Sequence, residues 1–135
     1  MSKLISIVTP TFNEEENIKK LCSSIKEMMS GIKYDYEHIV IDNCSTDNTI
    51  KLLKNIASTD KKLKVILNSR NFGHIKSPVH GLCQAKGDAI ILMMSDFQDP
   101  IDLIPQYIAE WEKGTKVVMA QKKTSDDNFL LHLTK

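Results

Sequence analysis

Two oxygen-bearing side chains suited to a hard metal ion follow the most apolar stretch of the chain. Residues 89–94 (AIILMM) are apolar without interruption, and Ser95-Asp96-Phe97-Gln98-Asp99 come directly after them. Asp96 and Gln98 alternate, so on an extended backbone their side chains point the same way. A carboxylate and an amide carbonyl suit Mg²⁺ or Mn²⁺, whose other ligands are usually water and phosphate oxygens. We therefore expect Asp96 and Gln98 to bind a divalent metal, and Asp99 to cap the next helix.

A second polar cluster, residues 10–14 (PTFNE), follows the first apolar run of the chain. Pro10 and Phe12 offer flat surfaces on which a ring can pack, and Glu14 offers a hydrogen-bond acceptor. A glutamate in the first turn of a helix is also favoured by the helix dipole. This structural explanation competes with a binding role for Glu14.

Two more clusters, residues 42–49 (DNCSTDNT) and 68–73 (NSRNFG), follow later apolar runs. Asp42 ends such a run, where its carboxylate can accept hydrogen bonds from a nucleobase or from ribose hydroxyls. Residues 45–47 are more typical of a polar turn with a helix cap. Arg70, the single arginine, could reach a phosphate, and Gly73 allows close approach of a ligand to the backbone. Neither GxGxxG nor GxxxxGK[ST] occurs, which argues against a dinucleotide dehydrogenase and a P-loop enzyme.

Strand-like and helix-like segments alternate along the chain. The apolar patterns predict strands at 4–9, 36–41, 62–68, 88–94 and 115–121, and helices at 14–30, 48–58 and 77–87. A further helix is expected after Asp99, with a break at Pro105 and its main body at 106–113. This order predicts an α/β fold with a mostly parallel, Rossmann-like sheet and helices on both faces.

The helix ends and the fourth strand carry finer predictions. Asn13 and Glu16 have the spacing of a capping box for the first helix. Ser77 followed by Pro78 predicts the start of the third helix. The lack of polar alternation in residues 88–94 predicts a parallel strand covered on both faces.

A parallel sheet would bring the four polar clusters together. Right-handed crossovers place the loops that follow the strands at one edge of the sheet, and open α/β sheets bind ligands at that edge. We therefore expect a single binding site to which all four clusters contribute.

Composition excludes several classes of protein. The 135 residues are enough for one domain with a real core, and a net charge of +1 gives no reason to expect a nucleic-acid partner. The three cysteines show no CxxC spacing and are expected to be free thiols. No apolar stretch approaches the roughly 20 residues of a membrane helix, and no signal peptide is visible.

Four stretches taken together resemble a known family. ISIVTPTFNEEENI, IVIDNCSTDNT, SRNFG and DAIILMMSDFQDP, in this order, resemble family 2 glycosyltransferases of the GT-A fold. The resemblance is closest to the branch that includes dolichyl-phosphate mannose synthase and bacterial polyisoprenyl-phosphate sugar transferases. It covers nearly the whole chain.

The resemblance implies a UDP- or GDP-linked sugar donor and a Mg²⁺ or Mn²⁺ cofactor. It implies metal binding by Asp96 and Gln98, with residues 94–96 in the place of the family's DxD motif. The residues that it implies for the nucleotide are Pro10, Phe12, Glu14, Val40, Asp42, Asn43, Arg70, Met94 and Ser95.

The chain departs from the family pattern at four positions. Met94 stands where the first acid of the DxD motif is usual, and it cannot accept a hydrogen bond from a ribose or sugar hydroxyl. Asn43 replaces the second acid of a pair after the second strand, and Cys44 replaces a glycine. Phe12 replaces the usual tyrosine. Donor affinity or selectivity is therefore expected to differ.

The resemblance also implies the division and role of the chain. Residues 1–121 would form the nucleotide-sugar-binding core, and residues 122–135 would begin an acceptor-side region that continues beyond this chain. The implied reaction is inverting transfer of a sugar to a lipid phosphate or a saccharide, in cell-envelope glycan synthesis. A general base, where one is needed, is expected beyond residue 135, so no catalytic residue is assigned.

The same resemblance places the enzyme in the cytoplasm, at the inner face of the membrane, with membrane contact only through parts absent from this chain. A different class of function stays open. Met94 and the absent acceptor half also fit a non-catalytic module that binds a nucleotide sugar. Metal-dependent turnover would distinguish the enzyme from the module.

Overall fold

The computed structural model describes residues 3–121 and 130–134, the last five as backbone only. The chain forms two compact units, Met1–Ile101 and Asp102–Lys135. The first unit contains all four polar clusters singled out above. The division at residue 121 into donor and acceptor parts is a statement about function and stays a prediction.

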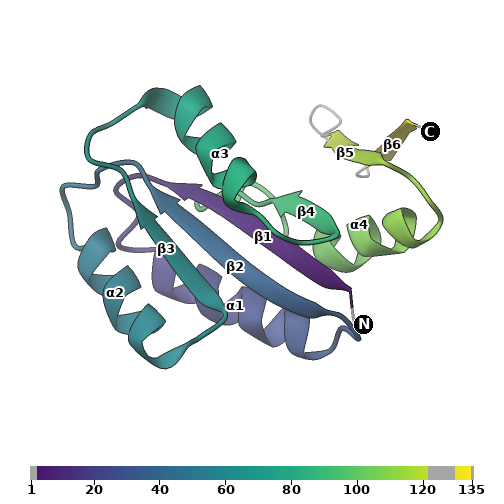
Figure 1. Ribbon diagram of the computed structural model, residues 1–135, viewed down its shortest axis with the longest axis horizontal. Coiled ribbons are helices and arrows are strands. Elements are labelled where there is room, and N and C mark those ends of the chain that lie inside the picture. Colours follow the sequence, from purple (N-terminus) through teal and green to yellow (C-terminus); the bar gives the residue numbers. More distant parts are fainter. Residues whose placement is uncertain (1–2, 122–129, 135) are drawn as a thin grey trace. The chain divides into compact units, whose positions relative to one another are not determined.

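A parallel four-stranded sheet forms the centre of the first unit (Figure 1). Its strands are β1 (Leu4–Thr11), β2 (Asp35–Asp42), β3 (Leu63–Leu67) and β4 (Ala89–Leu92), in the order β3-β2-β1-β4. β1 pairs with β2 along its full length, whereas β4 pairs only with residues 5–8 of β1. The α/β fold and the parallel sheet are therefore confirmed.

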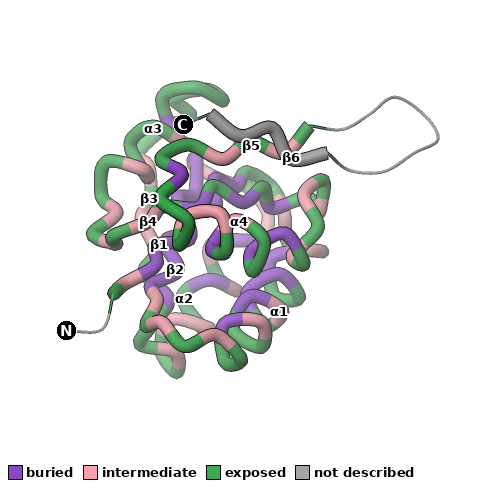
Figure 2. The backbone as a smooth tube through the Cα atoms, turned by 90° about the vertical axis from the view of Figure 1, so that its right-hand side faces the viewer, coloured by how far each residue is buried: buried purple, intermediate pink, exposed green. Residues whose placement is uncertain are grey.

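Helices cover both faces of this sheet. α1 (Ile18–Ser30) and α2 (Thr49–Thr59) lie on one face, and α3 (Gly73–Gln84) crosses the other (Figure 1). The central strands and the inward side of α1 form the core (Figure 2), which includes the fully buried Ile7, Leu21, Ile25 and Ile39.

The order of the strands creates a switch point between β1 and β4. From β1 the chain proceeds by α1 to β2 on one side, whereas β4 lies on the other side of β1. Crossovers that leave in opposite directions open a crevice at the carboxyl ends of the two strands, and ligands of open α/β sheets bind there. Pairing ends with the Met93 amide donating to the Val8 carbonyl at 2.9 Å, and beyond it the two strands separate.

The second unit contains α4 (Leu103–Glu112), β5 (Val117–Gln121) and β6 (Leu130–Thr134). β5 and β6 pair antiparallel in a sheet of their own. None of the helices in the described part of the chain is long and apolar enough to cross a membrane.

Two predicted helix starts are wrong because tertiary contacts override local signals. α1 begins at Ile18, and Asn13 adopts a left-handed backbone with φ of 53° instead of capping it. α3 begins at Gly73, so Ser77 and Pro78 lie inside it and do not form its first turn. The loop before α3 is held by the side chain of Asn43, which directly follows β2, and this anchoring lets the helix begin earlier in the chain.

Four further predictions fail near β4 and α4. Asp102, not Asp99, precedes α4, and Pro105 lies within its first turn, where a missing N–H breaks no hydrogen bond. β4 is shorter than predicted. It is also not covered on both faces, since Ile90 and Leu92 are 47% and 43% exposed while Ile91 is buried.

Candidate functional site

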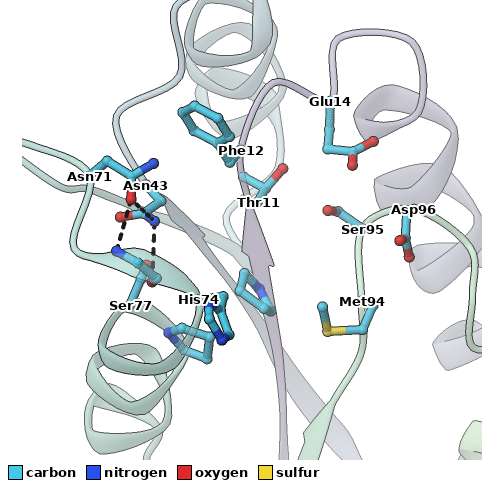
Figure 3. Close-up of a pocket in the computed structure, with 13 residues that line it drawn as sticks. Thr11, Phe12, Glu14, Asn43, Asn71, His74, Ser77, Met94, Ser95 and Asp96 are labelled. Atoms are coloured by element: carbon cyan, nitrogen blue, oxygen red, sulfur yellow. Dashed lines mark hydrogen bonds between the residues drawn. The ribbon is translucent and has the colours of Figure 1, made fainter.

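A cavity of about 410 Å³ lies at the switch point between β1 and β4 (Figure 3). Every one of the four strand-end loops contributes to its wall, so the predicted convergence of the polar clusters is confirmed. The lining residues are Pro10, Thr11, Phe12, Glu14, Asn43, Asn71, Gly73, His74, Ser77, Pro78, Met94, Ser95 and Asp96.

Hydrogen bonds join the loop after β1 to the loop after β2. The backbone N–H of Asn13 donates to Ser45 Oγ at 2.8 Å, and the backbone N–H of Thr46 donates to Asn13 Oδ1 at 2.8 Å. The Glu14 amide donates to Thr49 Oγ1 at 2.9 Å. These bonds explain the polar composition of residues 45–49 as structural, in agreement with the turn-and-cap interpretation. They also fix Glu14 at the mouth of the cavity.

Two predicted nucleotide contacts lie behind the cavity wall. Val40 and Asp42 are fully buried and do not line the cavity. The Asp42 carboxylate accepts hydrogen bonds from both the amide and the hydroxyl of Ser45. This geometry does not support direct contact of either residue with a base, and instead gives Asp42 the task of shaping its own loop.

Asn43 lines the cavity, but its amide group is fully used inside the protein. Its Nδ2 donates to Asn71 Oδ1 at 2.9 Å and to the Gly73 carbonyl at 3.3 Å. Its Oδ1 accepts from Asn68 Nδ2 at 3.1 Å and from the Phe72 amide at 2.9 Å. A primary amide has two donors and two acceptor lone pairs, so none remains for a ligand. Asn43 therefore positions residues 71–73, and these bonds set the start of α3.

His74 is a lining residue that the sequence analysis missed. It follows Gly73, whose φ of +83° turns the chain into α3, and its imidazole lies beside the cavity (Figure 3). The predicted start of α3 at residue 77 placed His74 in a loop. The available signal was the glycine before it, because a left-handed residue held by a neighbouring loop can begin a helix.

Non-glycine residues with a left-handed backbone occur at this edge of the sheet. Asn13, Cys44 and Phe97 have φ of 53°, 68° and 58°, in the loops after β1, β2 and β4. Such conformations are costly for L-residues and tend to cluster at functional sites. Their placement supports the same site as the cavity.

Residues 94–96 form the wall opposite β1. Met94 is 38% exposed and Ser95 is buried, and the Asp96 carboxylate is exposed and lines the cavity (Figure 3). Gln98 is exposed but does not line it, and its backbone N–H donates to Asp96 Oδ1 at 3.2 Å. A solvent-accessible carboxylate at the cavity edge fits Mg²⁺ or Mn²⁺, which need few protein ligands. Within the described ranges, no three His, Cys, Asp or Glu residues gather into a metal site.

Arg70 lies outside the cavity lining. Its guanidinium stacks over the ring of Phe72, with 4.7 Å between Cζ and the ring centroid. A contact between Arg70 and a donor stays a prediction.

Comparison with known proteins identifies the family. The family model described as "Glycosyl transferase family 2" matches residues 6–135. The chain belongs to glycosyl transferase family 2. The sheet, its switch point and the flanking helices are those of the GT-A fold, as the resemblance implied.

Relatives from bacteria match over most of this chain but less than half of their own length. The chain is 37% identical over 130 residues to a putative glycosyltransferase, CsbB, of Bacillus subtilis, covering 96% of this chain and 40% of the relative. It is 33% identical over 127 residues to an undecaprenyl-phosphate 4-deoxy-4-formamido-L-arabinose transferase of Pseudomonas fluorescens, covering 93% and 37%. The chain thus spans about two fifths of the length of these relatives.

A solved structure of similar fold contains both a metal and a nucleotide. It is glucosyl-3-phosphoglycerate synthase from Mycobacterium tuberculosis, in complex with Mn²⁺, UDP and glucosyl-3-phosphoglycerate. The identity is 26%, the TM-score is 0.60, and the match covers 80% of this chain and 39% of that one.

Proposed function

We propose that this chain is the donor-binding part of an inverting glycosyltransferase that uses a nucleotide-diphosphate sugar and a divalent metal. The observation that carries the proposal is the cavity at the β1–β4 switch point, with Asp96 at its edge. Membership of family 2 and the Mn²⁺ and UDP in the mycobacterial structure support it.

The residues around the cavity divide into two roles in this proposal. Pro10 and Phe12 provide apolar surface for the base, and Phe12 is 44% exposed and available for stacking. Glu14 and Ser95 provide polar groups for the nucleoside. Val40 and Asp42 support the wall from behind, and Asn43 lines the cavity but only positions residues 71–73. Arg70 would need to leave Phe72 to reach a phosphate.

Asp96 would hold the metal, with Gln98 completing the protein ligands once its side chain turns toward the cavity. A bound Mg²⁺ or Mn²⁺ there would neutralise negative charge on the diphosphate of the donor. In the reaction, an acceptor oxygen attacks the anomeric carbon, and the nucleoside diphosphate leaves from the opposite side with its electron pair. We assign no general base within this chain.

The acceptor that we propose is a lipid phosphate of the polyprenyl type, with a glycan as the other acceptor class. The undecaprenyl-phosphate relative supports the lipid phosphate. An anionic phosphate oxygen attacks without a strong base, whereas a glycan hydroxyl would need one. This acceptor would place the reaction in the cytoplasm, at the inner face of the membrane.

The first test is a thermal-shift panel with UDP, GDP and their sugars, each with and without Mn²⁺. Ligand at about 100 times its dissociation constant adds roughly 2.7 kcal/mol to the stability of the folded state. We expect a shift with at least one uridine or guanosine ligand and a smaller shift after the metal is chelated.

Asp96→Asn tests the metal ligand directly, because it removes the charge with little change of shape. We expect the metal-dependent part of the shift to vanish in Asp96→Asn and to persist in Asp99→Asn, a matched change outside the cavity lining. No shift of the wild-type chain with any nucleotide would contradict the proposal. A nucleotide-induced thermal shift that is the same with and without Mn²⁺ and in Asp96→Asn would favour a non-catalytic binding module. Met94 in the place of an acid also fits such a module.

A further inference from the structure

Thr11 carries a hydroxyl that has no partner in the protein. The residue is 3% exposed, at the last position of β1. Its Oγ1 is the one buried side-chain oxygen or nitrogen atom without a hydrogen bond among the residues that the structure describes. A buried polar group that has lost its water and gained no partner destabilises the fold, so such a group calls for a partner.

The unpaired hydroxyl lies in the wall of the candidate site. Thr11 lines the cavity, and Figure 3 shows its hydroxyl directed into the gap between β1 and the segment that carries Ser95 and Asp96. Continuing the β1–β4 register from Val8–Leu92 places Thr11 level with Ser95. Pairing between the two strands ends before this level, at the bond from the Met93 amide to the Val8 carbonyl, so a ligand that widens the gap slightly can enter between the two hydroxyl groups.

Thr9, on the same strand, shows the contrast. It is also buried, but its Oγ1 is 2.9 Å from Nε2 of His38. Of these two threonines, the one inside the sheet has a partner from the protein, and the one that lines the cavity has none.

We propose that the Thr11 hydroxyl is a hydrogen-bond partner for a ribose hydroxyl of the nucleotide, and this rests on the proposed donor-binding function. Glu14 and Asp96 line the same part of the cavity, and their carboxylates oppose a bare phosphate. A ribose hydroxyl can donate to a carboxylate and at the same time accept from Thr11. Met94 offers no polar group for that purpose, so Thr11 supplies from β1 a contact that the residue in the acid position cannot make.

Thr11→Val tests the inference, because valine has nearly the shape of threonine without the hydroxyl. In the ligand-free chain this change removes an unpaired buried group, so we expect the melting temperature to rise by about 3 °C. With Mn²⁺ present, we expect calorimetric titration to show about fivefold weaker binding of UDP or GDP. Thr11→Ser, which keeps the hydroxyl, should retain wild-type affinity.

The matched control is Thr9→Val, which breaks a bond that the protein uses. We expect it to lower the melting temperature and to leave nucleotide affinity unchanged. The 2′-deoxy and 3′-deoxy forms of UDP and GDP identify the ligand group. The form that lacks the partner hydroxyl should bind wild type and Thr11→Val equally.

Three results would overturn the inference while leaving the donor site in place. They are equal UDP and GDP binding by wild type and Thr11→Val, a lower melting temperature of Thr11→Val, and equal weakening for ribose and both deoxy forms. Absence of nucleotide binding by wild type would instead contradict the proposed function itself.

Discussion

The same residue type performs different tasks in this protein, depending on its neighbours. Asp42 and Asp96 both follow apolar strands, yet Asp42 is buried against Ser45 while Asp96 is exposed at the cavity. Asn43 holds a loop with its whole amide group, although its position suggested a base contact. Residue type and position in the sequence thus pointed to the edge of the sheet that carries the cavity, while hydrogen-bond partners separate side chains free to meet a ligand from those used inside the protein.

Cys44 offers a test of backbone strain at the residue scale. Its φ of 68° is unfavourable for an L-residue, and the resemblance implied a glycine at this position. We expect Cys44→Gly to raise the free energy of unfolding by about 0.5–1 kcal/mol, after allowance for the greater freedom of glycine in the unfolded chain. Urea denaturation of the ligand-free protein measures this change.

Gly73 provides the reciprocal control. An added Cβ would meet no atom within 4 Å, but φ is +83°, so Gly73→Ala introduces strain without a clash. We expect the free energy of unfolding to fall by about 1 kcal/mol in Gly73→Ala.

A lower free energy of unfolding in Cys44→Gly than in wild type would contradict the expectation for Cys44. It would show that packing of the thiol outweighs the backbone strain.

At the scale of elements, the two ends of the sheet have different roles. The carboxyl ends of the strands carry the cavity, whereas a buried polar cluster joins the elements at the amino ends. There Ser6 donates to Glu37, and Glu37 also accepts from the Lys86 amide at 2.8 Å and pairs with Lys64. Burial alone would raise the pKa of Glu37, but the hydrogen bonds from Lys64, Ser6 and the Lys86 amide lower it.

Gly87 is the point where the connection from α3 to β4 passes closest to β1. A Cβ at this position would lie 2.6 Å from the Ser6 backbone nitrogen and 2.7 Å from Ser6 Oγ. We expect Gly87→Ala to cost about 3 kcal/mol, since a backbone contact cannot move aside as a side chain can. The free energy of unfolding in urea is the measurement.

Gly31→Ala is the matched control at the end of α1. Its Cβ would lie 3.7 Å from the Met28 carbonyl oxygen, an ordinary contact, and φ is −89°. We expect a change below about 0.5 kcal/mol there. Similar values for the two alanine variants would contradict the close packing at Gly87.

At the scale of the whole molecule, the buried His38 couples folding to pH. Burial lowers the pKa of His38 from its ordinary 6.5 to about 4, and the nearby Asp60 opposes only part of this effect. The unfolded chain therefore binds a proton at a pH where the folded chain does not. Unfolding takes up that proton, so stability falls as the pH falls from about 6.5 toward 4.

The expected loss across this window is on the order of 3 kcal/mol. Denaturation midpoints are measured at intervals from pH 7 to pH 5, and the difference between wild type and His38→Gln isolates the contribution of His38. In His38→Gln, the free energy of unfolding should change less between pH 7 and pH 5 than it does in wild type. A wild-type stability that does not change between pH 7 and pH 5 would contradict the assigned role of His38.

Much of the architecture was readable from local patterns. Apolar runs and helical spacing depend on residues near one another in the chain, so they predicted β1, β2, β3, α1, α2 and the parallel sheet. The polar clusters after these strands predicted the shared site, because parallel crossovers bring strand ends to one edge. The motifs of the family pointed to the same edge through residues such as Phe12 and Asp96.

Other features depended on contacts between distant segments and could not be read from local patterns. The early start of α3 follows from bonds between Asn43 and residues 71–73. The exposure of Ile90 and Leu92 on one face of β4 depends on which distant segments cover the sheet, and the apolar run does not encode this. The isolated hydroxyl of Thr11 is visible only once every possible partner has a position in space. Side-chain type and the spacing of apolar residues can be read along the chain. Burial and hydrogen-bond pairing depend on segments that meet only in the folded structure.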